Sequence, residues 1–404
     1  MKRAASVLSQ WFIQIVADGD AAQGDRPIVA RMPQQSRLPN STKTLPMQLL
    51  PQSFRIPGDH LHWTHHRKHS QLIMNSSKDK SAWLPRLAAL LIAISLVSCG
   101  STENHSRQDL VSQHYIYVLG TAQDGGLPQI GCQKDCCQRV RKDLRARRLV
   151  TSLLLVDSQS KSRWLFDASP DIKEQTEVAV GHPQGRHLVG SRPPLFEGIF
   201  LTHAHIGHYA GLVHLGRESY GSKDLPIFAT KSMSQFLTNN GPWSLMVETG
   251  AIDLQVIRDR HPVALGDNLR VTPFLVPHRG EFTDTCGFLI EGPNKSLFYL
   301  PDIDKWDKWK TPIESIIAQV DYALIDGTFF ADGEIPGRAM SEIPHPFIAE
   351  SLARFKDLPA SERQKIYFTH LNHTNPAAIQ GGKAQQEINA HGMHVAERGM
   401  ILGL

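Results

Sequence analysis

Residues 200–212 read Phe-Leu-Thr-His-Ala-His-Ile-Gly-His-Tyr-Ala-Gly-Leu, and this stretch decides the fold. An apolar strand runs into His203, His205 and His208, and a helical pattern follows at once. Alternate residues of a strand share one face, so the end of the strand places His203 and His205 on the same side. A tight turn then brings His208 to the same point. Three imidazoles that converge on one centre suit zinc or iron, so the sequence predicts a metal site at the end of this strand.

Strand-like runs recur on both sides of this stretch. Each is short, apolar and rich in β-branched residues, and each is followed by Gly, Pro, Asp or Asn. The expected strands are Tyr115–Leu119, Ser152–Val156, Trp164–Asp167, Gly198–Thr202, Leu254–Ile257, Arg270–Val276, Gly287–Glu291, Ser296–Leu300, Tyr322–Ile325 and Lys365–Thr369. Helical patterns lie between them at Asp171–Val180, His208–Arg217, Lys231–Asn239, Ile313–Val320 and Pro346–Phe355. Because strands and helices do not alternate cleanly, we expect an α/β (α+β) fold with sheets packed face to face and helices outside.

The composition excludes several classes of protein. Hydrophobic residues make up 41% of the 404 residues and charged residues 20%, which is enough to bury a globular core. Five cysteines are too few for a disulfide-rich scaffold, and the apolar runs are too few for a polytopic membrane protein. Residues 1–99 carry 12 Lys and Arg against 5 Asp and no Glu, whereas the remainder carries 31 basic and 34 acidic residues. The body is mildly acidic, so we expect no nucleic-acid partner.

A secretion signal is predicted at residues 74–99. A basic start precedes an apolar run at Leu87–Val97, which is about the length of a signal-peptide core and short for a bilayer span. Leu-Val-Ser-Cys at residues 96–99 resembles a bacterial lipobox, in which the cysteine, here Cys99, is lipidated. The alternative is a buried core helix that ends in a cysteine.

This signal sets the expected domain organisation. Residues 1–73 are interpreted as an over-extended and disordered N-terminus, residues 100–113 as a flexible tether and residues 114–404 as one domain. We expect a protein of the bacterial cell envelope, anchored by lipid and facing the periplasm. It would be cytoplasmic if the signal is not used. The lipid anchor is the one membrane contact expected, and no oligomeric state is predicted.

Further candidate site residues follow other expected strands. They are Asp167 in Leu-Phe-Asp-Ala-Ser-Pro-Asp, His278 in Leu-Val-Pro-His-Arg, Asp302 in Tyr-Leu-Pro-Asp-Ile-Asp and His370 in Phe-Thr-His-Leu-Asn-His. With the three histidines of residues 203–208, this order resembles the metallo-β-lactamase superfamily, whose signature is H-x-H-x-D-H. The resemblance covers residues 115–404. It implies an αββα sandwich of two mixed sheets with helices outside.

The resemblance also implies ligand sets. His203, His205 and His278 would hold a first metal, His208 and His370 with the signature aspartate a second, and Asp302 would lie between the two. Asp167 would be a carboxylate that supports a ligand. The signature aspartate is Gly207 in this chain, so the second site loses one anionic ligand. Asp304 and His373 are the nearby side chains that could compensate, and the alternative is that they are surface or capping residues.

A second metal site is predicted near the start of the domain. Cys132, Cys136 and Cys137 are too close together in sequence for ordinary disulfides and open a basic helix. They suit a tetrahedral structural zinc that lacks one ligand, for which His345 is a candidate. A redox pair or free thiols are the alternatives.

Four segments resemble one branch of the superfamily in particular. The glycine-rich start with its cysteines, the Asp-Ala-Ser-Pro-Asp stretch, Asp326-Gly-Thr and His-Leu-Asn-His-Thr-Asn-Pro at residues 370–376 look like one branch of the superfamily. That branch contains coenzyme PQQ synthesis protein B and is similar to phosphonate-pathway cyclic phosphodiesterases. Synthesis protein B departs from the histidine signature, whereas this chain keeps all three histidines.

These residues predict a metal-dependent hydrolase. A metal held by three imidazoles leaves a position open for water and lowers the pKa of that water to roughly 7. Asp302 would orient the nucleophile, and His208 or His370 would complete a second site or act as acid or base. Arg279 and Tyr209 are candidate contacts for a small-molecule substrate, or structural residues.

Three functions remain open. The first is a zinc enzyme that cleaves an ester, phosphodiester, lactone or amide, with one catalytic zinc, a second if the loss at Gly207 is compensated, and one structural zinc. Manganese or iron could replace zinc at the catalytic site. The second is an iron-dependent oxidative enzyme or carrier related to PQQ biosynthesis. The third is a binder of a small acidic molecule without catalysis.

Overall fold

The computed structural model describes residues 113–181, 194–337 and 339–404. The chain divides into two units, Met1–Ala93 and Ile94–Leu404, and the described residues all belong to the second. The predicted signal, with Cys99, and the two flanking segments therefore lie outside the described residues. Within the described residues, no helix combines the length and the apolar character that crossing a membrane requires.

The first sheet is formed by the N-terminal half of the domain together with the last strand of the chain. Its strands are β1 (His114–Gly120), β2 (Ser152–Asp157), β3 (Ser162–Phe166), β4 (Gly198–Phe200), β5 (Leu225–Ala229), β6 (Ile252–Val256) and β14 (Ile401–Gly403). Their order is β14-β1-β2-β3-β4-β5-β6. The pairs from β14 to β3 are antiparallel, and the pairs from β3 to β6 are parallel.

The second sheet repeats this pattern. Its strands are β7 (Val263–Ala264), β8 (Arg270–Val276), β9 (Thr285–Glu291), β10 (Ser296–Leu300), β11 (Tyr322–Asp326), β12 (Ile366–Thr369) and β13 (His394–Val395). Their order is β13-β12-β11-β10-β9-β8-β7. The pairs from β7 to β10 are antiparallel and those from β10 to β13 are parallel. In both sheets, therefore, several strands end on the same edge.

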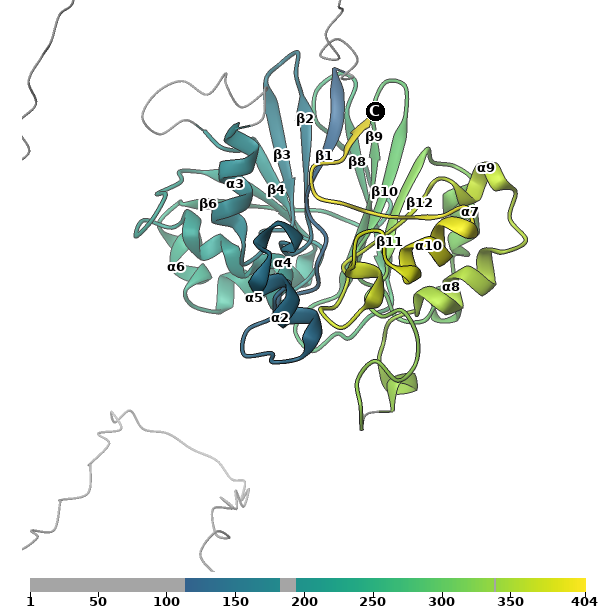
Figure 1. Cartoon of the computed structure of the whole chain (residues 1–404). Coiled ribbons are helices and arrows are strands. Elements are labelled where there is room, and N and C mark those ends of the chain that lie inside the picture. Colours follow the sequence, from purple (N-terminus) through teal and green to yellow (C-terminus); the bar gives the residue numbers. More distant parts are fainter. Residues whose placement is uncertain (1–112, 182–193, 338) are drawn as a thin grey trace, which may run out of the picture. The chain divides into compact units, whose positions relative to one another are not determined.

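Helices cover the outer faces of the two sheets (Figure 1). Over the first sheet lie α3 (Ile172–Gly181), α5 (Lys231–Asn239) and α6 (Trp243–Glu248). Over the second lie α7 (Ile313–Ile317), α8 (Ile348–Phe355) and α10 (Lys383–Ala390). The short helices α2 (Asp135–Lys142), α4 (Ile206–Tyr209) and α9 (Ala360–Arg363) complete the set in the described residues.

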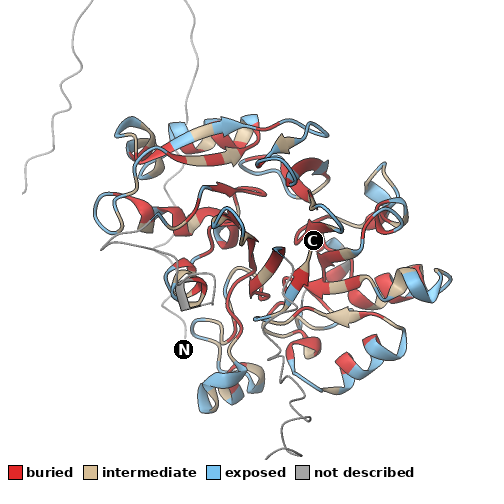
Figure 2. Ribbon diagram, turned by 90° about the horizontal axis from the view of Figure 1, so that it is seen from above, coloured by how far each residue is buried: buried red, intermediate tan, exposed pale blue. Residues whose placement is uncertain are grey.

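Three apolar cores hold these layers together. One lies between each sheet and its helices, and the third fills the space between the sheets. In the third, Phe166 and Phe200 stack with ring centroids 5.0 Å apart, and Phe288 meets both rings edge-on. Figure 2 shows buried residues in the strands and on the helix sides that face them. Because both faces of each sheet are covered, strands such as β2 (Ser-Leu-Leu-Leu-Val-Asp) are apolar throughout rather than alternating.

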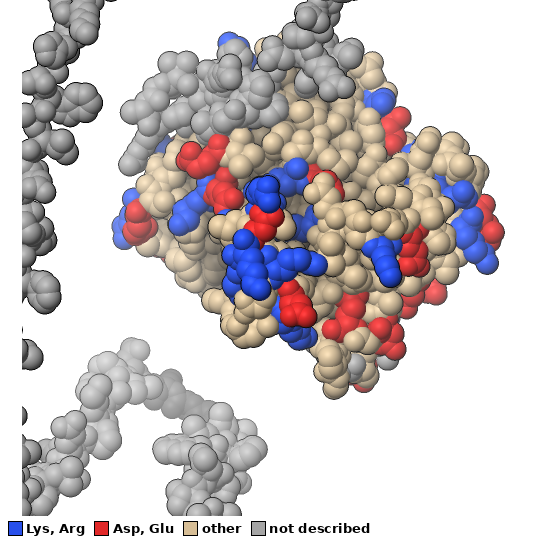
Figure 3. All heavy atoms as spheres, in the orientation of Figure 1, with Lys and Arg blue, Asp and Glu red and all other residues tan. Residues whose placement is uncertain are grey.

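The expected fold is confirmed: two mixed sheets pack face to face between helical layers. All ten expected strands are present, and β5, β7, β13, β14, α6, α9 and α10 were not among the expected elements. The helix expected at His208–Arg217 is instead the end of α4 followed by a 3₁₀ helix at Ala210–Leu215. The strand β5 contains Pro226, which weakens its strand signal. Lys and Arg side chains gather over α2, which carries Arg139, Arg141 and Lys142, on the face shown in Figure 3, with acidic side chains between them.

Candidate metal centre

The predicted ligand residues follow the carboxyl ends of strands from both sheets. In the first sheet β4 ends at Phe200, and the next residues lead through His203 and His205 into α4, which carries His208. In the second sheet β8, β10 and β12 are followed by His278, Asp302 and His370. The ends of strands are where side chains from several elements can converge on one ligand.

One group of three imidazoles forms around the end of β4. Ring nitrogens of His203, His205 and His278 all lie within 4.8 Å of one another. His203 Nε2 is 2.8 Å from His205 Nδ1, and the ring of His278 is centred 5.4 Å from that of His203. The structure therefore brings together the three residues predicted to hold a first metal.

A second group surrounds Asp302. Its Oδ2 lies 2.9 Å from His208 Nε2, 3.2 Å from His370 Nε2 and 3.8 Å from His203 Nε2, while its Oδ1 lies 3.6 Å from His278 Nε2. The carboxylate thus faces both groups of histidines. A carboxylate in this position could be shared between two cations.

The donor atoms fit divalent cations. Among the described residues, both ring nitrogens of His278, Asp302 Oδ2 and Asp124 Oδ1 are buried without a hydrogen-bond partner. Buried polar atoms without partners are rare, and each calls for an explanation. Imidazole nitrogen and carboxylate oxygen are ligands of zinc, iron and manganese, so bound cations would satisfy the two carboxylate oxygens and one ring nitrogen of His278.

Asp167 fixes the ring of His208. Its Oδ2 lies 2.7 Å from His208 Nδ1, and its Oδ1 accepts the backbone N–H and the hydroxyl of Thr202, both at 2.9 Å. The carboxylate is fully buried at the end of β3, in the left-handed region with φ of 64°. With Nδ1–H donated to Asp167, Nε2 of His208 is left to face Asp302. The structure thus places Asp167 where a carboxylate would support a metal ligand.

Asp326 does the same in the second sheet. It ends β11, and its Oδ1 accepts the hydroxyl of Thr328 at 2.7 Å. Thr328 Oγ1 is then free to accept Nδ1–H of His370 at 2.9 Å, which turns Nε2 of His370 toward Asp302. The sequence assigned no role to Asp326, although its place at a strand end matched that of Asp167.

Burial and charge give the imidazoles different protonation states. Burial lowers the pKa of His203 and His370, and lowers that of His278 to about 4. These rings are therefore neutral at pH 7, which is the form that binds metals. Burial also opposes a charge on His208, but the carboxylates of Asp167 and Asp302 outweigh it and hold the pKa of His208 well above its ordinary value.

A residue that the sequence did not single out lies beside the second group. Asp124 follows β1, and its Oδ1 is 3.6 Å from His208 Nε2 and 4.0 Å from His370 Nε2. Ligand atoms of these three residues all lie within 4.8 Å of one another. Asp304, which was considered as a compensating ligand, instead lies 2.7 Å from Lys308 Nζ. Asp304 is closer in sequence to the predicted ligands, but the carboxylate that lies beside His208 and His370 is that of Asp124.

The three cysteines do come together, but with a different histidine. His373 Nδ1 lies 3.4 Å from Cys137 Sγ and 3.7 Å from Cys136 Sγ, and the two sulfurs are 3.9 Å apart. The edges of a zinc tetrahedron with Zn–S bonds of about 2.3 Å are about 3.8 Å long, so the spacing fits zinc. Burial raises the pKa of Cys137 to about 12, opposite to the shift that makes a thiol reactive.

His345 is not the fourth residue of the cysteine group, and this prediction is wrong. Its Nδ1 lies 2.7 Å from Asp326 Oδ2 and 3.6 Å from Asp302 Oδ1, and the residue is buried. Burial opposes a charge on His345, but Asp326 outweighs it and raises its pKa. His345 reaches the histidine centre because the loop that follows β11 in sequence folds back to the end of that strand, at Asp326. Sequence spacing does not reveal this.

The two candidate substrate contacts lie in different surroundings. Arg279 is exposed at the rim and pairs with Glu281 at 3.2 Å, whose other oxygen is 3.3 Å from His205 Nε2. Tyr209 is buried in the first sheet's outer core, with its ring 4.7 Å from that of Trp243. The structure therefore gives Tyr209 a packing role, the second of the two roles that the sequence left open.

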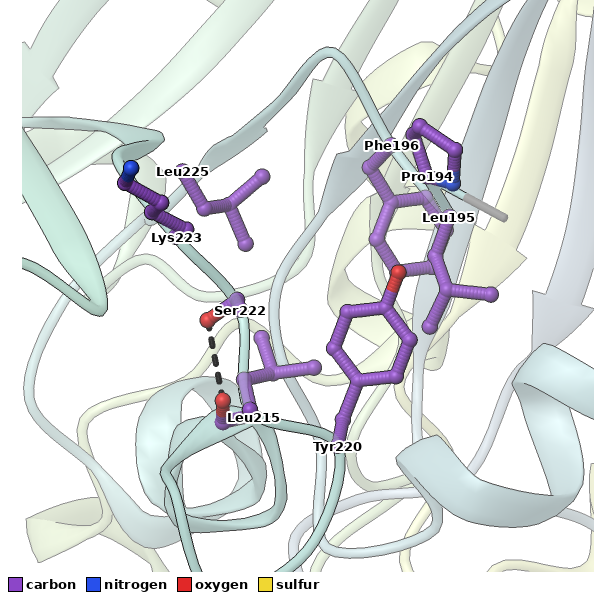
Figure 4. A pocket seen from close by; sticks show the side chains of 9 residues that line it. Pro194, Leu195, Phe196, Leu215, Tyr220, Ser222, Lys223 and Leu225 are labelled. Atoms are coloured by element: carbon purple, nitrogen blue, oxygen red, sulfur yellow. Dashed lines mark hydrogen bonds between the residues drawn. The ribbon is translucent and has the colours of Figure 1, made fainter. Parts of the chain in front are cut away.

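A separate hollow of about 250 Å³ lies beside the first sheet (Figure 4). It is lined mainly by apolar side chains, among them Leu195, Phe196 and Leu215. The hydroxyl of Ser222 donates to the carbonyls of Leu215 and Ala251, both at 2.9 Å. None of the ligand candidates lines this hollow.

Comparison with known proteins gives the same fold. The family described as a β-lactamase superfamily domain matches residues 162–371. Coenzyme PQQ synthesis protein B of Methylobacterium nodulans is 29% identical over 316 residues, which cover 71% of this chain and 99% of that protein. The protein of the same name from Nitrosococcus oceani is 30% identical over 318 residues, covering 70% and 98%.

Two solved structures share the architecture. Zn²⁺-bound PqqB from Methylobacterium extorquens has a TM-score of 0.62 at 24% identity, covering 72% of this chain and all of that one. A diphosphatase from the PhnP family has a TM-score of 0.51 at 21% identity, covering 72% and 98%.

Proposed function

The chain belongs to the metallo-β-lactamase superfamily, and on that premise we propose that it is a metal-dependent hydrolase of an ester, phosphodiester, lactone or amide. One observation carries the proposal: ligand atoms of five histidines and Asp302 from both sheets converge, and those of His278 and Asp302 are buried without a hydrogen-bond partner in the described residues. A site that only stabilised the fold would leave no reason to bury these atoms without hydrogen bonds. The neutral state of His203, His278 and His370 supports metal binding.

The residues divide between the proposed metals. His203, His205 and His278 would hold the first, with zinc as the leading candidate and manganese or iron as alternatives. His208 and His370 would contribute to a second, with Asp302 between the two. When bound, a divalent cation supplies a water of lowered pKa and polarises the bond under attack. The cysteines and His373 would hold a separate structural zinc.

The remaining groups have separate tasks in the proposed reaction. Asp167 and Thr328 hold the rings of His208 and His370 so that each presents Nε2. Asp302 carries the negative charge that the shared position needs: burial opposes this charge, but the hydrogen-bonded His208, whose own pKa is raised, and the other facing imidazoles outweigh burial and keep the pKa of Asp302 well below its ordinary value.

His345 is the residue placed to move a proton. Its Nδ1 is held by Asp326, and the ring lies 5.1 Å from that of His278, so it borders the site without belonging to the His203, His205 and His278 group. We assign it the donation of a proton from Nε2 to the leaving group. His208 and His370, considered for this task from the sequence, both direct Nε2 at Asp302 instead.

The test compares two histidine variants of the full chain. His203→Ala removes a proposed ligand, while His214→Ala changes a histidine on the 3₁₀ turn Ala210–Leu215, away from the donor groups. With p-nitrophenyl acetate and bis(p-nitrophenyl) phosphate as probes, we expect H203A to lose at least about a hundredfold of the metal-dependent rate. H214A should keep it. Equal rates for the wild type and H203A would refute the proposal.

A second candidate is an oxidative enzyme, because the relatives of 29% and 30% identity are named for coenzyme PQQ synthesis. It requires iron at the histidine centre and consumption of oxygen without hydrolysis. Elemental mass spectrometry of protein purified without added metal, together with an oxygen electrode, separates the two. Iron and oxygen uptake with no turnover of either ester would favour the oxidative function.

A further inference from the structure

Gly207 leaves the second metal position one carboxylate short, judged against the H-x-H-x-D-H signature. Because glycine has no side chain, the segment that carries His203, His205 and His208 cannot supply this ligand itself. A carboxylate from elsewhere in the chain is needed to complete a second site beside His208 and His370.

Asp124 fills the space that a side chain at residue 207 would take. An ideal Cβ built on Gly207 would lie 2.1 Å from Asp124 Oδ1 and 2.8 Å from Asp124 Cα. Real Cβ atoms do not approach other atoms so closely. The carboxylate of Asp124 therefore stands where the first atoms of an aspartate at residue 207 would be, and the two side chains exclude each other.

The backbone holds Asp124 in this place through the segment that carries His370. Leu371 N–H donates to the carbonyl of Thr121 at 2.8 Å, and Gln123 N–H donates to the carbonyl of Leu371 at 2.9 Å. A turn then closes with Gly126 N–H on the carbonyl of Gln123 at 2.7 Å. Asp124 lies inside this turn, directly after a residue bonded to the neighbour of His370. Its position is thus set by the backbone rather than by a flexible side chain.

The free oxygen of Asp124 points to a ligand. Oδ1 is buried and has no hydrogen-bond partner within the described residues, yet it lies 3.6 Å from His208 Nε2 and 4.0 Å from His370 Nε2. A buried carboxylate oxygen without a partner is costly unless a cation satisfies it. We propose that Asp124 is the carboxylate ligand of the second metal, in place of residue 207; this rests on the proposed metal-dependent function.

The experiment counts metals in the full chain. Protein stripped with a chelator is reloaded with zinc alone, freed of excess by gel filtration and measured by elemental mass spectrometry. The wild type should carry about three zinc ions per chain, one of them at the cysteines. Asp124→Asn keeps the shape of the side chain and removes its charge, and should lower the count to about two. Asp304→Asn removes the alternative carboxylate and should leave about three.

Gly207→Ala tests the same point without removing any ligand. Its Cβ would displace Asp124, so this variant should also bind about two zinc ions. If G207A fails to fold, D124N decides alone. Zinc titration of D124N should show the second affinity lowered by more than about tenfold, the least that the loss even of a supporting group costs.

The outcomes separate this inference from the proposed function. Three zinc ions in D124N, or a loss in D304N alone, would overturn the assignment while the hydrolase proposal stands. Two zinc ions in the wild type would overturn the assignment and leave an enzyme with a single catalytic metal. One zinc ion in the wild type, held at the cysteines, would overturn both.

Discussion

Replacing Asp167 by asparagine should cost about 3–5 kcal/mol of stability, the range for a buried ion pair that loses one partner. Its carboxylate is fully buried and accepts from four groups: the Thr202 N–H and hydroxyl, His208 Nδ1 at 2.7 Å and the Tyr299 hydroxyl at 3.3 Å. Asparagine offers one acceptor oxygen and turns an NH₂ group toward donors on the other side. Because asparagine tolerates the positive φ of this position, the backbone adds no strain.

The entropy of unfolding gives the change in Tm that corresponds to this loss of stability. At about 2.1 cal/mol/K per residue, a domain of about 290 residues loses about 1.6 °C of Tm for each kcal/mol, so Asp167→Asn should lower Tm by about 5–8 °C. The affinity of the His208 metal should fall about 10–100-fold. Thermal and urea unfolding of the metal-free and zinc-loaded chains measure the first effect, and zinc titration measures the second.

The matched control is Asp253→Asn, since Asp253 is an exposed carboxylate on β6. Its stability should change by less than about 0.5 kcal/mol. The reasoning about Asp167 is refuted if D167N changes stability by under about 1 kcal/mol and binds zinc as the wild type does.

Three further predictions follow from the described contacts. His373→Ala should remove one zinc ion per chain while the zinc of the histidine centre remains, as elemental mass spectrometry would show; unchanged zinc would contradict the cysteine site. His345→Gln should lower kcat about 10²–10⁴-fold with the metal count unchanged, and a lost metal would instead make His345 a ligand. Burial raises the pKa of Glu334, so its ionisation disfavours folding as pH rises above 4.5. Glu334→Gln should therefore gain Tm over the wild type as the pH rises above 4.5, whereas the exposed Glu342→Gln should show the same pH dependence as the wild type.

The layers of the fold and the strand-end ligands were predictable from local patterns. Apolar runs bounded by turn residues mark strands, and the spacing of His203, His205 and His208 directly after such a run predicts that their rings converge. His278, Asp302 and His370 were placed through the resemblance to the metallo-β-lactamase superfamily, because their motifs follow in the order of that family. These predictions needed no knowledge of which strands pair.

The residues that were missed depend on pairing between distant segments. Asp124 reaches His208 because the segment after β1 hydrogen-bonds to Leu371, about 250 residues further along the chain. His373 belongs to the cysteines for the same reason, since it follows Leu371 by two residues. The two roles left open for Tyr209 could not be separated from the sequence, because a helix next to a site has one side toward the site and another toward the core, and the hydrophobic period does not tell which side is which.

The close fit between Gly207 and Asp124 constrains the order in which such a site can arise by mutation. A side chain at residue 207 and the present path of residue 124 exclude each other, so no ancestor can have held both carboxylates in this geometry. The position at residue 207 had to lose its side chain before, or together with, the arrival of aspartate at residue 124. If the two substitutions occurred one at a time, the intermediate protein had neither carboxylate. On the proposed ligand assignment, that intermediate would have had to function with a single metal in the histidine centre.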